Sequence, residues 1–146
     1  DGSGEVRTLP AAECGLSYRH SLFSDRPDWL IVEAELALRP GDAGAIRERM
    51  EELMARRREK QPLEYPSAGS TFKRPEGHFA AALIDQCGLK GLTVGGAQVS
   101  EKHAGFIVNR GGATCADILG LIDQVRERVL RETGVPLELE VRTLGL

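Results

Sequence analysis

The sequence predicts an α+β fold in which a two-layer domain occupies roughly residues 62 to 146. Helical and strand-like patterns are mixed along the chain, and there is no internal repeat or low-complexity tract. Apolar residues recur at helical spacing after Thr114, whereas apolar and polar residues alternate in the last segment, LELEVRTL. Short apolar runs separated by glycines lie before that helix and indicate strands. We therefore expect both helices and a sheet in the C-terminal part.

The N-terminal part is expected to contribute two strands and one helix. Residues 5–8 (EVRT) fit a short strand, and residues 29–38 (WLIVEAELAL) alternate apolar and acidic side chains as a half-buried strand does. Asp42 can cap a following helix, whose apolar residues keep helical spacing up to about Lys60. This part is expected to be the end of a different domain.

The middle of the chain is expected to contain a long loop and several short elements. Residues 62–78 should form neither helix nor strand, because prolines and glycines punctuate them throughout. Residues 79–88 suit a short buried helix. The segment after it predicts three short strands, around residues 93–94, 98–99 and 106–108.

The clearest helix follows Thr114, which forms a capping-box pattern with Asp117. The helix carries one apolar stripe, made of Ile118, Leu121, Ile122, Val125 and Val129. Gly134 is a typical residue for its end, and Pro136 prevents its continuation. Residues 137–144 then predict a strand with Leu and Val side chains on one face.

Composition excludes several classes of function. A net charge of −3 and 28% charged residues give no electrostatic case for a nucleic-acid or membrane partner. No apolar stretch approaches the ~20 residues that a membrane span needs. The histidines lack metal-ligand spacing, so no metal site is expected. Three scattered cysteines, Cys14, Cys87 and Cys115, indicate reduced thiols used in packing, as in a cytoplasmic protein.

Four features could carry chemistry, and none is decisive by itself. Ser70 follows a glycine in a stiff segment, where it is either a turn serine or a proton donor beside a ligand. Glu140 is either a solvated surface carboxylate or a rigidly mounted general acid. The pairs Tyr18-Arg19 and Lys73-Arg74 offer cations that suit carboxylate or phosphate groups. The residues alone indicate an α+β domain with a basic, glycine-rich loop that could bind an anion.

The motifs become specific when they are taken together. They are, in chain order, YRHS (18–21), KQP (60–62), AGSTFKRP (68–75), GHFA (77–80), GGAQVS (95–100), KHAGFIVN (102–109) and ELEVR (138–142). The set closely resembles the C-terminal half of the UDP-N-acetylenolpyruvoylglucosamine reductase (MurB) family. The short distance from Arg19 to Ser70 resembles the family type that lacks an extra tyrosine-bearing loop.

The resemblance implies an oxidoreductase that uses NADPH and FAD in peptidoglycan precursor synthesis in the cytoplasm. Its substrate would be UDP-N-acetylglucosamine enolpyruvate, and its product UDP-N-acetylmuramate. The fold implied is a C-terminal substrate domain, residues 62–146, joined to the tail of an α+β flavin-binding (PCMH-like) domain, residues 1–61. The family's glycine-rich flavin loops do not occur in this sequence. The chain alone is therefore expected to be inactive, and an isolated, non-catalytic UDP-sugar-binding module is the alternative.

The resemblance also implies roles for individual residues. Ser70 matches the family's proton donor, and Arg19 and Glu140 match its partners at the substrate carboxylate and the cofactor. The substrate-binding residues expected from the matched motifs are Tyr18, Lys60, Lys73, Arg74, Gln98 and Asn109. Many family members have asparagine at the position of Arg74, and a subset with the downstream GHFA motif has arginine. Arg74 is therefore an expected contact to a substrate phosphate or carboxylate.

Overall fold

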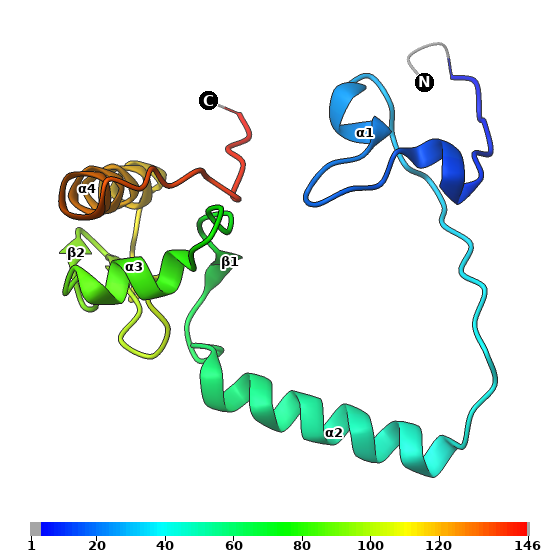
Figure 1. Cartoon of the computed structure of the whole chain (residues 1–146), viewed down its shortest axis with the longest axis horizontal. Helices are drawn as coiled ribbons and strands as arrows, with labels where there is room; N and C mark the ends of the chain where they lie inside the picture. The colour runs from blue at the N-terminus through cyan, green and yellow to red at the C-terminus, as the bar shows by residue number, and fades with distance from the viewer. Residues whose placement is uncertain (1–3, 146) are drawn as a thin grey trace. The chain divides into compact units, whose positions relative to one another are not determined.

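The computed structural model describes residues 4–145, which divide into two compact units between Gly41 and Asp42 (Figure 1). The expected domain boundary between residues 61 and 62 stays a prediction. No helix within residues 4–145 is long and apolar enough to cross a membrane.

The first unit contains two short helices, η1 (Ala11–Cys14) and α1 (Leu22–Asp25). The strands expected at residues 5–8 and 29–38 are wrong, because both segments lack regular structure. A strand is stable only when a neighbour completes its hydrogen bonds, and among the described residues no strand pairs with either segment. Residues 30–38 are accordingly exposed in the described structure, and Leu38 is 83% exposed.

The second unit begins with α2 (Ala43–Lys60), as the sequence predicts. The Asp42 carboxylate accepts a hydrogen bond from the Ala45 backbone N–H at 2.8 Å, which satisfies one of the free donors at the start of the helix. The apolar residues of α2 remain largely exposed, and Met50 is 65% exposed.

A four-stranded antiparallel sheet has the order β1-β4-β3-β2. Its strands are β1 (Ser67–Ser70), β2 (Thr93–Val94), β3 (Ala97–Val99) and β4 (Phe106–Asn109). Strands β2, β3 and β4 confirm the sequence prediction. The expectation of a loop throughout residues 62–78 is wrong, because β1 pairs with β4, nearly forty residues later in the chain. Proline and glycine spacing cannot reveal so distant a partner.

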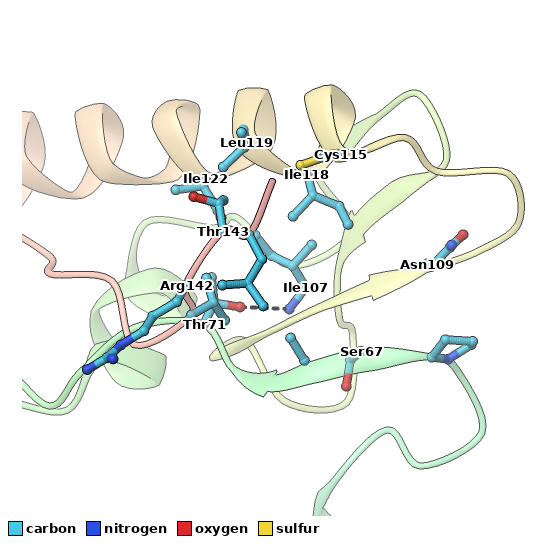
Figure 2. Close-up of a pocket in the computed structure, with 14 residues that line it drawn as sticks. Ser67, Thr71, Ile107, Asn109, Cys115, Ile118, Leu119, Ile122, Arg142 and Thr143 are labelled. Atoms are coloured by element: carbon cyan, nitrogen blue, oxygen red, sulfur yellow. Dashed lines mark hydrogen bonds between the residues drawn. The ribbon is translucent and has the colours of Figure 1, made fainter. Parts of the chain in front are cut away.

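Helices α3 (Ala80–Gln86) and α4 (Cys115–Thr133) form the second layer. Their buried side chains pack in one cluster with Ala97 and Val99 of β3 and Ile107 of β4. Figure 2 shows α4 lying along one face of the β1–β4 pair. The two-layer α+β arrangement predicted from the sequence is confirmed.

The caps of α4 follow the sequence prediction. The Thr114 hydroxyl accepts from the Asp117 N–H at 3.1 Å, and the Asp117 carboxylate accepts from the Thr114 N–H at 2.8 Å. Gly134 ends the helix in the left-handed conformation, with φ 74°.

The strand expected at residues 137–144 is wrong as a full strand, because it is reduced to a single bridge between Leu139 and Phe72. The expected alternation is nevertheless present, since Leu137 is buried and Glu138 is exposed. The partner segment is only residues 71–73, which is too short to extend the ladder. The cysteines also differ: Cys87 is buried as expected, Cys14 is half-buried, and Cys115 is exposed.

Candidate active site

Ser70 lies on the face of the sheet that points away from the helices. It is the last residue of β1 and pairs with Phe106 of β4. Directly opposed residues of antiparallel strands project to the same face, and neighbours along a strand project to opposite faces. Ile107 packs with the helices, so Phe106 and Ser70 project to the other side. The Ser70 side chain is exposed there.

A bulge in β1 precedes Ser70. The register between β1 and β4 shifts between Ser67 and Ser70, and Gly69 within this bulge has φ 86°. A residue with a side chain rarely adopts that backbone conformation, so glycine is the residue that suits it. The Gly-Ser pair is therefore an irregular strand end and not the turn that punctuation suggests.

Thr71 fixes the backbone directly after Ser70. Its N–H donates to the Gly105 carbonyl at 2.9 Å, and its hydroxyl oxygen accepts from the Ile107 N–H at 3.2 Å (Figure 2). The residue is only 3% exposed. The threonine hydroxyl thus satisfies the Ile107 N–H directly after the bulge.

A backbone hydrogen bond holds Glu140 beside Thr71, the residue that follows Ser70. Its N–H donates to the Thr71 carbonyl at 2.9 Å, and the Lys73 N–H donates to the Glu138 carbonyl at 2.8 Å. Glu140 is half-buried. Two of the three expected catalytic residues, which are 70 positions apart in sequence, are therefore joined through one residue, Thr71.

The basic residues after Ser70 have specific partners. The Lys73 ammonium pairs with the Glu138 carboxylate at 3.2 Å, and both side chains are well exposed, so the pair adds little stability. The Arg74 guanidinium carbon lies 4.0 Å from the centre of the Phe79 ring, and its Nε–H donates to the His78 carbonyl at 3.3 Å.

Tyr18 and Arg19 occupy the tip of a tight turn in the first unit. Ser17 and His20 close the turn through backbone hydrogen bonds of 3.0 and 3.4 Å. Arg19 has φ 56°, a conformation that is uncommon for any residue other than glycine. Its guanidinium carbon lies 5.7 Å from the centre of the Tyr18 ring. Arg19 thus belongs to residues 1–41, whereas Ser70 and Glu140 belong to residues 42–146.

The other expected substrate residues are spread over the second unit. Lys60 is the exposed last residue of α2. The Gln98 amide nitrogen donates to the Gly91 carbonyl at 3.3 Å and to the Thr93 hydroxyl at 3.2 Å. The Asn109 amide oxygen accepts from the N–H groups of the loop before α4, those of Gly111 and Ala113. These bonds hold local structure, and the substrate roles of the three residues stay predictions.

A cavity of about 480 Å³ lies between α4 and the β1–β4 pair (Figure 2). Its lining is mostly apolar and includes Ile107, Ile118 and Ile122, together with Thr71 and Val141. Ile107 projects to the helix side, so the cavity is on the opposite face of the strands from the Ser70 side chain. We therefore place the candidate active site on the face of Ser70 and not in this cavity.

Two residues of the site were missed in the sequence. Thr71 gives no motif of its own, although a β-branched polar residue directly after a Gly-Ser bulge is the available signal. Phe79 is expected only within a short helix and within the GHFA motif, although an aromatic residue five positions after an arginine offers it a stacking partner. Among residues 4–145, no cluster of three histidine, cysteine, aspartate or glutamate side chains could hold a metal ion.

Comparison with known proteins identifies the family. Residues 61–144 match the family model described as UDP-N-acetylenolpyruvoylglucosamine reductase, C-terminal domain. The UDP-N-acetylenolpyruvoylglucosamine reductase of Agathobacter rectalis is 54% identical over 142 residues, which are 97% of this chain and 45% of the relative. The Clostridium novyi protein of the same name is 52% identical over 145 residues, 99% of this chain and 47% of the relative.

A solved structure agrees with these matches. The crystal structure of UDP-N-acetylenolpyruvylglucosamine reductase (MurB) from Thermus caldophilus is 38% identical, with a TM-score of 0.72, and the match covers 90% of this chain and 47% of that one. The chain thus spans about half the length of the curated relatives it matches. The chain belongs to the UDP-N-acetylenolpyruvoylglucosamine reductase family, of which it carries the C-terminal domain.

Proposed function

We propose that this chain is the C-terminal part of an enzyme that reduces UDP-N-acetylglucosamine enolpyruvate to UDP-N-acetylmuramate with NADPH and FAD. The reaction would serve peptidoglycan precursor synthesis in the cytoplasm. The names of the relatives support the reaction, and the span of the chain supports its place in a longer protein. The structural observation that carries the proposal is the joining of Ser70 and Glu140 through Thr71.

Ser70 is the proposed proton donor. Reduction of the vinyl ether leaves a strongly basic carbon, which must take up a proton. A serine hydroxyl is a poor acid in water, and it serves only when it is held against such a base. The bulge and the buried Thr71 hydrogen bonds fix the backbone on both sides of Ser70, which supports a fixed position for its hydroxyl.

Arg19 is the proposed partner of the substrate carboxylate. Negative charge develops on this group as the double bond is reduced, and a fixed cation stabilises it. Arginine suits the role because its guanidinium stays charged at any working pH and binds both carboxylate oxygens. Glu140, half-buried beside Thr71, is proposed to assist at the same group by orienting the substrate and its hydrogen bonds.

We propose that residues of this chain form part of a flavin site. Arg19 is a cation on a tight turn of the first unit, and Ser70 is an exposed hydroxyl of the second unit. The chemistry that FAD supplies when bound is transfer of hydride from NADPH to the vinyl carbon. The glycine-rich flavin loops that the family resemblance implies are not among the motifs that this chain matches. We therefore propose that residues 1–61 are the tail of a flavin-binding domain and that residues 62–146 bind the substrate.

Several cations and amides of the chain are proposed to bind the UDP-sugar. Phosphate and carboxylate oxygens are recognised by ammonium and guanidinium groups, and sugar hydroxyls by amides. The proposed contacts are Tyr18, Lys60, Lys73, Arg74, Gln98 and Asn109.

The test of the proposal is Ser70→Ala in the full-length reductase, with Ser67→Ala as a matched control on the same strand. Flavin reduction by NADPH should be unchanged in Ser70→Ala. Reoxidation by the enolpyruvyl substrate should be about 10²- to 10⁴-fold slower, the usual contribution of a general acid. Ser67→Ala should reoxidise at the wild-type rate. A wild-type reoxidation rate in Ser70→Ala would reject the proton-donor role.

We also propose that the chain alone is inactive. Its absorption spectrum after addition of FAD tests this, followed by NADPH consumption with the substrate. A perturbed flavin spectrum with turnover would show that these residues hold a complete site.

A further inference from the structure

Phe79 departs from two local preferences, that of aromatic side chains for burial and that of helix N-caps for polar residues. Its side chain is 60% exposed, although a phenylalanine ring stabilises a fold mainly when it is buried. It also occupies the N-cap of α3, where no side chain accepts a hydrogen bond from the helix. Serine, threonine, aspartate and asparagine are strongly preferred at such a position. Departures from local rules of this kind concentrate at functional positions.

The Phe79 ring supports the guanidinium of Arg74. The guanidinium carbon lies 4.0 Å from the ring centre, well within the distance at which a cation is attracted to an aromatic face. The Arg74 Nε–H donates to the His78 carbonyl at 3.3 Å. The loop between them is closed by the His78 N–H, which donates to the Pro75 carbonyl at 3.1 Å. Ring, carbonyl and loop therefore restrict one long side chain.

Restriction of this kind matters for an arginine that binds an anion. A free arginine side chain carries about 2 kcal/mol of rotamer entropy, part of which is lost when it binds a ligand. A guanidinium already held against a ring has lost much of this freedom before the ligand arrives, and its planar fork keeps a fixed direction. Arg74 is four residues after Ser70, along a segment that pairs in extended form with residues 138–140.

We propose that Phe79 is a positioning residue, which holds the Arg74 guanidinium for an anionic oxygen group of the substrate. The inference rests on the proposed function, in which Arg74 contacts the UDP-sugar. Phosphate and carboxylate oxygens share the chemistry that this guanidinium recognises. Phe79 touches neither and acts through Arg74.

The test uses the full-length reductase and three variants of Phe79. Phe79→Leu removes the aromatic face, Phe79→Tyr keeps it, and Phe79→Asn removes it while supplying a good helix cap. We expect KM for the enolpyruvyl substrate to rise about three- to tenfold in the Leu and Asn variants, and to stay near wild type in Phe79→Tyr. Flavin reduction by NADPH should be unchanged in all three. The Tm of Phe79→Asn should equal or exceed that of wild type, which a merely structural role would not allow.

A control variant tests whether the effect is specific to Phe79, and an inhibitor identifies the group that Arg74 binds. Tyr65→Leu is the matched control, because it removes another stack of similar geometry, in which the Arg110 guanidinium carbon lies 4.1 Å from the ring centre. Its KM should be unchanged. UDP, which has a diphosphate but no carboxylate, serves as a competitive inhibitor. Weaker inhibition by UDP in Phe79→Leu than in wild type assigns Arg74 to the substrate phosphates. Unchanged inhibition assigns Arg74 to the substrate carboxylate.

The variant Arg74→Ala decides which inference fails. If it raises KM while Phe79→Leu and Phe79→Asn leave KM unchanged, the positioning role of Phe79 is overturned. If Arg74→Ala itself leaves KM unchanged, the proposed substrate contact of Arg74 is rejected instead.

Discussion

Gly96 is the position where one added methyl group should damage the second unit most clearly. It immediately precedes β3, at the turn between β2 and β3. A Cβ atom at Gly96 would lie 2.5 Å from the Ala113 nitrogen and 2.9 Å from the Ala113 Cα, and also against the Gly111 carbonyl oxygen. All of these are backbone atoms, which cannot rotate away as a flexible side chain would.

The loop that Gly96 touches is itself fixed. The Asn109 amide oxygen accepts from the Gly111 N–H at 2.9 Å and the Ala113 N–H at 3.2 Å, and the Arg110 N–H donates to the Gly96 carbonyl at 2.8 Å. Relief of the clash must therefore break or stretch some of these bonds. Overpacking costs about 1–3 kcal/mol, and each weakened hydrogen bond adds about 1 kcal/mol. We expect Gly96→Ala to lower the free energy of unfolding by about 3 kcal/mol.

Gly120→Ala is the matched control. Gly120 is inside α4, and a Cβ there would meet nothing closer than a Val94 methyl carbon at 3.8 Å, an ordinary contact. Alanine is a better helix former than glycine by about 0.5–1 kcal/mol, so this variant should be slightly more stable than wild type. Urea unfolding followed by circular dichroism measures both, because the single tryptophan, Trp29, lies in the first unit. If Gly96→Ala unfolds within about 0.5 kcal/mol of wild type, the packing argument is wrong.

Two more outcomes test the frame of the site. Thr71→Val should lower the free energy of unfolding by about 1–3 kcal/mol, because the buried Ile107 N–H loses its acceptor. Thr71→Ser keeps the hydroxyl oxygen and should lower it less. Equal urea midpoints for Thr71→Val and wild type would contradict this expectation. The Thr114 N–H and hydroxyl hold the pKa of Asp117 below its usual range. This contribution is present above the ordinary carboxyl pKa of about 3.9 and is lost as the pH falls through the lowered value. Wild type should therefore be more stable than Asp117→Asn at about pH 7, with the difference fading in acid below about pH 4; a difference that is constant with pH, measured by urea unfolding, would refute the capping argument.

The elements that the sequence predicts correctly are those whose signals are local. Helix α4 has its cap, its apolar stripe and its terminal glycine within one continuous segment, so its prediction depends on no other part of the chain. Residues 29–38 show how an equally clear local pattern can mislead. Alternation states which face a strand would bury, but the strand forms only if a neighbour supplies hydrogen bonds, and no described strand does so.

Strand β1 was missed for the converse reason. Its four residues, SAGS, have small side chains and low strand propensity, and its pairing with β4 stabilises it. The candidate site likewise depends on contacts that local sequence does not reveal. Resemblance to a family selects Ser70 and Glu140, but it does not indicate that the Thr71 hydroxyl accepts from the Ile107 N–H or that the Phe79 ring lies against Arg74. Both contacts are three-dimensional, and one of them joins residues 36 positions apart.

The links that hold the candidate site together are mostly main-chain bonds, which has a consequence for mutagenesis. Ser70 is placed by the pairing of β1 with β4, and Glu140 by its N–H donating to the Thr71 carbonyl. Neither link involves the side chain that is proposed to act. Replacing the Ser70 hydroxyl or the Glu140 carboxylate should therefore leave the backbone frame in place, so that a change in rate reports chemistry. Replacing Thr71 should instead move both groups together, because its hydroxyl accepts from the Ile107 N–H of β4 and its carbonyl accepts from the Glu140 N–H. This architecture requires that substitutions of Ser70 and Glu140 lower the rate strongly with little loss of stability. Substitutions of Thr71 should lower stability more than they lower the rate.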